Sequence, residues 1–180
     1  FQSADAPLWF VWALGKYFKK QHHPKSFLAK YGNAISEILN AYKNSTLKYV
    51  GTTSNGLVYA SLEKTPLTWM NSMVDGYPVV QRDGLAIEIN ALWYNAIAFA
   101  VELAHAAGET EFAETWKKEL KTTGESFVNT FWNPGHRHLA DVVNGDRFDW
   151  SVRPNMVIAL AMEHTPLTVA QQKSTLDVIT

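Results

Sequence analysis

Residues 89–107, INALWYNAIAFAVELAHAA, are apolar on almost every side of a helix, and this stretch decides the fold. Polar positions are rare in it until its end, whereas a helix at the surface of a globular protein keeps one polar face. A helix without a polar face has to be buried on most of its sides. The stretch therefore predicts a helix that other elements surround.

Working outward from it, two further apolar segments occupy residues 8–14 and 156–162. Amphipathic stripes with the three- and four-residue spacing of a helix follow each apolar segment, at residues 27–42, 112–131 and 169–179. Short connections favour antiparallel neighbours. The alternation predicts three hairpins, each with an inner and an outer helix, and hence an all-α fold that is part of a double-layered ring.

A long stretch without helical periodicity separates the first two hairpins, at residues 47–86. It opens with a β-hairpin signal, because residues 48–50 and 57–59 flank Asn55-Gly56, a pair that suits the positive φ values of a tight turn. Loops of this length in a compact domain are usually functional or disordered. Since this one holds Trp69 and Tyr77, we expect it to be ordered and functional.

Composition narrows the classes of partner. The 180 residues carry a net charge of −1 without a basic run, so the electrostatic footprint of a nucleic-acid binder is missing. No apolar stretch has the length of a membrane span. The lack of cysteine excludes thiolate metal sites, and it weakly favours a reducing compartment such as the cytoplasm. We expect a neutral ligand, and no metal, cofactor, nucleic acid or membrane. Because the chain opens without Met and ends inside an apparent helix, we interpret residues 1–180 as one domain fragment.

Polar side chains gather where each inner helix begins. Asp5 precedes the first inner helix. Six polar residues or tryptophans precede or open the second: Thr68, Trp69, Asn71, Asp75, Arg82 and Glu88. Four polar residues precede or open the third: Asp149, Ser151, Arg153 and Asn155. These starts lie at the same end of the predicted ring, where loops on a rigid scaffold carry binding chemistry. The pattern predicts one shared pocket.

Each of these residues also has a purely structural interpretation. Asp5 is a natural N-cap for the first helix, and Glu88 in a first helical turn suits the helix dipole. Arg153 and Asp149 are spaced so that they can form a structural ion pair. The coincidence of three clusters, rather than any single residue, favours the functional interpretation.

Several motifs resemble those of one known family. They comprise Ser3-Ala4-Asp5-Ala6-Pro7-Leu8-Trp9-Phe10, Leu67-Thr68-Trp69-Met70-Asn71, Pro78-Val79-Val80, Arg82, Gly84, residues 88–96 (EINALWYNA), Phe131-Trp132-Asn133 and Arg153-Pro154-Asn155. The chain is similar to the amylo-α-1,6-glucosidase domain of glycogen debranching enzymes. The resemblance extends from Ser3 to about Ala161 and is longest and most specific in the middle.

The resemblance implies an (α/α)6 barrel, or toroid, of which three hairpins would be half. It also implies a glycoside hydrolase that removes α-1,6-linked glucose from branches of glycogen-like glucans, so the expected partner is an α-glucan or oligosaccharide. Inverting hydrolysis needs two carboxyl groups with a water between them. The second one, the general base, is expected beyond Thr180, in the remainder of the same polypeptide.

The chain departs from the family at one important position. Many relatives have an aspartate, their proposed general acid, where this chain has Asn71, and a carboxamide cannot donate the proton. Asp75 or Glu88 can supply the carboxyl group instead, and we expect Asp75. The alternatives are a glycan-binding module that has lost the reaction, and a related α-glucosidase of different linkage specificity.

The expected site is therefore as follows. Asp75 is the general acid, with Glu88 as the other catalytic candidate. Glu88 and Arg82 hold sugar hydroxyls, and Trp69 stacks on the sugar ring. The same pocket is lined by five more residues: Asp5, Asn71, Trp93, Arg153 and Asn155.

Overall fold

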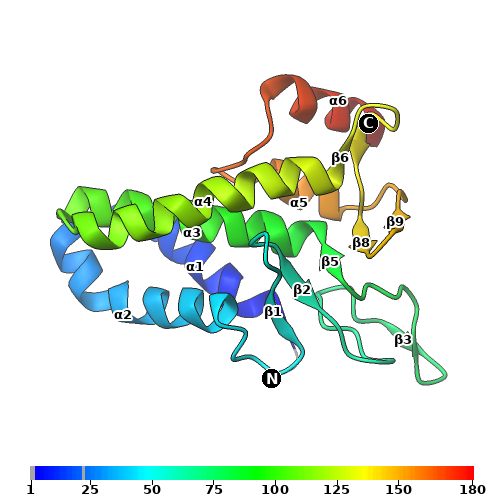
Figure 1. Ribbon diagram of the computed structural model, residues 1–180, viewed down its shortest axis with the longest axis horizontal. Coiled ribbons are helices and arrows are strands. Elements are labelled where there is room, and N and C mark those ends of the chain that lie inside the picture. Colours follow the sequence, from blue (N-terminus) through cyan, green and yellow to red (C-terminus); the bar gives the residue numbers. More distant parts are fainter. Residues whose placement is uncertain (1–2, 22) are drawn as a thin grey trace.

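The computed structural model describes residues 3–21 and 23–180, in which six helices run in the predicted order (Figure 1). They are α1 (Ala6–Phe18), α2 (Pro24–Lys43), α3 (Ile87–Ala107), α4 (Thr110–Phe131), α5 (Asn155–Leu160) and α6 (Val169–Ile179). Each predicted helix is confirmed. The last inner helix is shorter than its apolar segment, because it ends at Leu160 and not at Met162. None of the helices in the described residues has the length and hydropathy to cross a bilayer.

Helix α3 is the centre of the arrangement, as residues 89–107 predict. It contacts α1, α2, α4 and α5, and α4 runs beside it along most of its length (Figure 1). Apolar side chains all around it, such as Leu92 and Ile97, are fully buried. The helix ends at Ala107, and Gly108 after it has a φ of 89°, the left-handed conformation that glycine adopts at helix C-termini.

The other inner helices are less buried than their sequences predict. Leu8, Val11 and Leu14 of α1 are buried against the core, but Phe10 is 45% exposed. Val157 of α5 is 44% exposed in the same way. Both helices pack against α3, and α1 also contacts α2 while α5 contacts α6, but these contacts leave Phe10 and Val157 partly exposed.

The chain is mainly helical, as expected, and it contains more strands than the one predicted β-hairpin. Within the described residues, nine short strands form four small antiparallel sheets. The pairs are β1 (Val50–Thr52) with β2 (Val58–Ala60), β3 (Met73–Val74) with β4 (Tyr77–Pro78), and β6 (Trp132–Asn133) with β7 (His138–Leu139); β5 (Leu85–Ala86), β8 (Val142–Asn144) and β9 (Arg147–Asp149) form the fourth sheet.

The predicted β-hairpin is confirmed as the pair of β1 and β2. Gly56 in its turn has a φ of 81°, as the Asn-Gly signal predicts. The first strand begins at Val50 and not at residue 48, because Tyr49 has a φ of 70° and cannot continue an extended strand.

The sheet of β5, β8 and β9 positions the polar residues. Strand β5 leads directly into α3, and it pairs with β8 in the segment that precedes α5, with Ala86 opposite Val142. The backbone N–H of Ile87 donates to the carbonyl of Asp141 at 3.0 Å, and the N–H of Asp141 donates to the carbonyl of Asp149 at 2.7 Å. The start of α3 and the approach to α5 are thereby joined through the backbone.

Candidate functional site

A buried arginine stands at the junction of these segments. Arg82 lies between β4 and β5 and is only 6% exposed. Its two terminal nitrogens donate to the two carboxylate oxygens of Glu88, with 2.7 Å between Nη2 and Oε2. Its Nε and Nη2 each lie 3.1 Å from one oxygen of the Asp141 carboxylate. The planar guanidinium thus binds two carboxylates in bidentate fashion, an arrangement that the point charge of lysine cannot reproduce.

Both acidic partners are fully buried. Glu88 in the first turn of α3 and Asp141 just before β8 have no exposed surface. Nη1 of Arg82 lies 3.3 Å from the hydroxyl of Thr68, and Nη2 lies 3.2 Å from the carbonyl of Asp141. Buried charges persist only when they are paired and hydrogen-bonded, and these partners meet that requirement.

Arg82, Glu88, Asp141 and Thr68 form the buried part of a polar cluster, which extends from Asp141 towards the surface. Nη1 of Arg153 donates to Asp141 at 2.8 Å and to Asp149 at 2.7 Å. The amide of Asn155 donates to Asp141 at 2.7 Å, and the indole N–H of Trp69 donates to the amide oxygen of Asn155 at 2.8 Å. Trp69 is 44% exposed, so one hydrogen-bonded path leads from the buried arginine to an accessible aromatic ring.

The cluster is a charged framework. Burial lowers the pKa of Arg82, but the bonds and charges of Glu88 and Asp141 outweigh it and raise the pKa, so this side chain stays protonated. Burial raises the pKa of Glu88, and Arg82 acts in the opposite direction. At Asp149 burial also acts to raise the pKa, but hydrogen bonds from Ser151 and the charge of Arg153 lower it below its ordinary value.

The structure brings together seven of the residues that the sequence singles out: Thr68, Trp69, Arg82, Glu88, Asp149, Arg153 and Asn155. The ion pair of Arg153 with Asp149, foreseen as the structural interpretation, is part of the same cluster.

Asp5 lies close to the cluster but is not bonded to it. The backbone N–H of Ala4 donates to the carbonyl of Leu67 at 2.7 Å, which holds the chain before α1 against the segment that carries Thr68. Asp5 is 5% exposed and accepts a hydrogen bond from the hydroxyl of Ser3. Although Asp5 occupies the N-cap position of α1, its side chain makes no capping bond.

Asn71 and Asp75 lie on an exposed arm formed by residues 69–79. Asp75 and Gly76 form the two-residue turn between β3 and β4, with φ values of 51° and 79°. Such a turn favours the Asp-Gly sequence for its backbone alone. In the described chain no hydrogen bond joins Asp75 to the cluster.

Two expectations need correction. Trp93 lies in the core at 2% exposure, where its indole N–H donates to the carbonyl of Gly56 at 3.0 Å and its ring stacks on Tyr42 with centroids 5.6 Å apart. It therefore has no surface to offer a sugar. Glu88 and Arg82 hold each other and not sugar hydroxyls, because the ion pair removes both side chains from solvent.

Asp141 is the residue that sequence reasoning missed. It accepts hydrogen bonds from both arginines and from Asn155, and so connects all the branches of the cluster. A signal was present, because Asp141 is a lone acidic residue in the apolar run Leu139-Ala140-Asp141-Val142-Val143. A charge that is carried into an apolar environment needs a partner of opposite charge.

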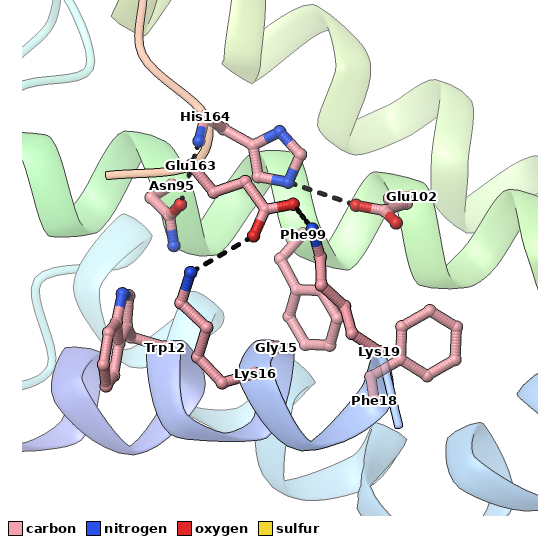
Figure 2. Close-up of a pocket in the computed structure, with 10 residues that line it drawn as sticks. All are labelled: Trp12, Gly15, Lys16, Phe18, Lys19, Asn95, Phe99, Glu102, Glu163 and His164. Carbon is pink, nitrogen blue, oxygen red and sulfur yellow. Dashed lines mark hydrogen bonds and ion pairs between the residues drawn. The ribbon is translucent and has the colours of Figure 1, made fainter. Parts of the chain in front are cut away.

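A second polar pocket lies near the C-terminal ends of α1 and α5 (Figure 2). Lys16 and Lys19 both reach Glu163, and Nε2 of His164 lies 3.1 Å from a carboxylate oxygen of Glu102. The cavity between them measures about 10 Å³, which is room for about one water molecule. It is too small for a sugar, as is the cavity of about 10 Å³ that Arg82 lines. The cluster around Arg82 is the candidate site because it reaches the surface at the exposed ring of Trp69.

Comparisons with known proteins agree with this fold. The sequence matches the family described as amylo-alpha-1,6-glucosidase over residues 1–180. No curated protein matches the chain in sequence. Among solved structures, the crystal structure of a GH78 family rhamnosidase of Bacillus sp. GL1 is similar, with a TM-score of 0.66 and 18% identity over 96% of this chain. The similar region is 16% of the rhamnosidase chain, so this chain spans a small part of that protein.

Proposed function

The chain belongs to the amylo-alpha-1,6-glucosidase family, and on this basis we propose that it supplies part of the sugar-binding site of a glycosidase that removes glucose from α-1,6 branches of an α-glucan. The observation that carries the proposal is the hydrogen-bonded path from buried Arg82 to exposed Trp69, at the starts of α3 and α5. A rigid buried support beneath an exposed aromatic ring is what a pre-organised sugar site requires.

Trp69 is the proposed stacking platform. Its only polar atom donates to Asn155, so the ring is held in one orientation and offers its apolar faces to a ligand. The C–H faces of a glucose ring pack on such a surface. Because the ring is already ordered, little conformational entropy is lost when the sugar binds.

Arg153 and Asp149 are the proposed contacts for sugar hydroxyls. Their side chains are 20% and 30% exposed, so they form the accessible edge of the cluster. Each keeps hydrogen-bonding capacity beyond their mutual ion pair, since Arg153 has five N–H groups and a carboxylate has four lone-pair positions. They take the role that the sequence assigned to Glu88 and Arg82.

The proposed proton donor is Asp75. Both oxygens of Glu88 accept hydrogen bonds from Arg82 inside the protein, which removes Glu88 from the role of acid and leaves it as the anchor of Arg82. Asp75 is exposed on the arm that begins at Trp69. An inverting reaction pairs this acid with a second carboxylate about 6.5–9.5 Å away, which we place in the remainder of the same polypeptide.

Glucose release from a branched dextrin by the intact protein tests this function. Proton NMR of the freshly released glucose distinguishes inversion from retention, because inversion of an α-linkage releases β-glucose. Asp75→Asn is expected to lower kcat at least 100-fold. Asp146→Asn is a matched control, since Asp146 occupies the exposed two-residue turn between β8 and β9. Turnover of Asp75→Asn at the wild-type rate would remove Asp75 from the acid role.

A non-catalytic glycan-binding module is the second candidate. Two observations favour it: Asn71 stands where many relatives have their acid, and the three cluster carboxylates are all paired with arginines. This function predicts saturable binding of maltooligosaccharides without glucose release. Parallel assays on α-1,6- and α-1,4-linked substrates also separate the debranching activity from that of an α-glucosidase with another linkage preference.

A further inference from the structure

We propose that the cavity beside Tyr49 is a second carbohydrate subsite, which holds a glucose unit of the same α-glucan away from the cleaved bond. The inference rests on the proposed function. The cavity measures about 440 Å³, within the range of about 300–1,000 Å³ that small-molecule sites occupy. Tyr49 forms one wall, and other walls are apolar: Pro7, Leu47, Val50 and Leu67.

The cavity adjoins the candidate site through one short segment. Leu67 lines the cavity, Thr68 contacts Arg82, and Trp69 carries the exposed indole. Two residues of extended chain span at most about 7 Å, so the cavity wall at Leu67 and the platform at Trp69 are within reach of one oligosaccharide. In Figure 1 the start of α1 lies near β1, and Pro7 of α1 and Val50 of β1 both line the cavity.

Tyr49 itself is held in an unusual conformation. Its φ of 70° is strained for a bulky residue, and such strain persists only where the surroundings impose it. The carbonyl of Tyr49 accepts a hydrogen bond from the N–H of Ser61 at 3.0 Å, which fixes the backbone. Tyr49 is 37% exposed and lines the cavity. Strain that places an aromatic ring at the edge of a cavity is typical of a functional position.

The chemistry of the walls suits a neutral sugar. Apolar side chains and the Tyr49 ring can pack against the C–H face of a glucose unit. Ser3 and Lys48 also line the cavity, and the Lys48 ammonium lies 4.7 Å from the centroid of the Tyr49 ring. These groups and the tyrosine hydroxyl offer hydrogen bonds to a rim of sugar hydroxyls, while the lysine charge disfavours a cationic ligand.

Binding of maltoheptaose and of glucose to the intact protein tests the subsite. Tyr49→Gly removes the ring at a position where glycine relieves the strain, so the fold is expected to survive. We expect the Kd for maltoheptaose to rise about tenfold, the loss of roughly one stacking contact, with the glucose Kd unchanged. Tyr59→Ala is the control, since Tyr59 is also 37% exposed but does not line this cavity.

Two results would overturn the inference. One is an unchanged maltoheptaose Kd in Tyr49→Gly, and if its Tm is also lower, another part of the protein packs on Tyr49. The other is an equal loss of binding in Tyr59→Ala. The proposed function fails separately, through the absence of glucose release by the wild-type protein. If the wild type releases glucose and Tyr49→Gly behaves like it on short and long substrates, only the subsite is wrong.

Discussion

The indole nitrogen of Trp69 lies 2.8 Å from the amide oxygen of Asn155, a bond between residues 86 positions apart in the chain. It joins an exposed ring on the loop before α3 to a side chain at the start of α5 with no exposed surface. Because Asn155 also donates to Asp141, the orientation of the ring depends on the buried charge cluster.

Asn155→Ala is expected to destabilise the intact protein by about 3 kcal/mol, because it leaves a buried carboxylate short of a donor and creates a small cavity. Because the Trp69 ring then loses its fixed orientation, the variant should also show a larger rise in KM than fall in kcat. Urea denaturation and steady-state kinetics measure the two effects. Asn144→Ala, at an exposed position on β8, serves as the control and should change neither. Equal stability of the two variants would contradict the prediction.

Arg82→Lys is expected to cost about 3–5 kcal/mol, the usual penalty for breaking a buried ion pair, although the charge is conserved. Lysine cannot bind Glu88 and Asp141 in bidentate fashion at the same time. Arg147→Lys at an exposed site on β9 is the matched substitution and should cost less than about 0.5 kcal/mol. A stable Arg82→Lys protein in thermal and chemical denaturation would show that charge alone maintains the cluster.

Asp149→Asn is expected to change the response to acid. The folded-state pKa of Asp149 lies below its ordinary value of 3.8, so its ionised form stabilises the fold. That stabilisation is fully present well above pH 3.8 and is lost as pH falls through the folded pKa. The difference in unfolding free energy between wild type and variant should therefore be largest near pH 7 and shrink below pH 4. A constant difference from pH 7 to pH 3 would exclude this linkage.

Gly84→Ala tests the joint that places β5 beside β8. Gly84 has a φ of 111°, and a Cβ there would lie 2.5 Å from the carbonyl oxygen of Val143. We expect a loss of about 3 kcal/mol or more, from backbone strain and the shift of the sheet. Gly145→Ala is the control, because Gly145 also has a positive φ, of 57°, but open space around it. It should cost about 1–2 kcal/mol. Similar losses in both variants would mean that the close approach is unimportant.

Much of the fold could be predicted because its signals are local. The three apolar segments at residues 8–14, 89–107 and 156–162 and the three amphipathic stripes predicted all six helices, and Asn55-Gly56 predicted the first β-hairpin. The other strands are two or three residues long, too short for alternation to be recognised. Pairing of β5 with β8 depends on contacts between segments far apart in the chain, which leave no pattern in either segment.

By itself the sequence determined where polar side chains gather, before and at the starts of α3 and α5, because helix boundaries and polar residues can both be recognised locally. Only the tertiary structure decided what each residue does there. Arg82 meets Asp141 across 59 positions, and this contact turns Arg82 and Glu88 from expected sugar ligands into a buried support. A charge surrounded by apolar groups binds the nearest opposite charge, and only the packing of the chain determines which charge that is.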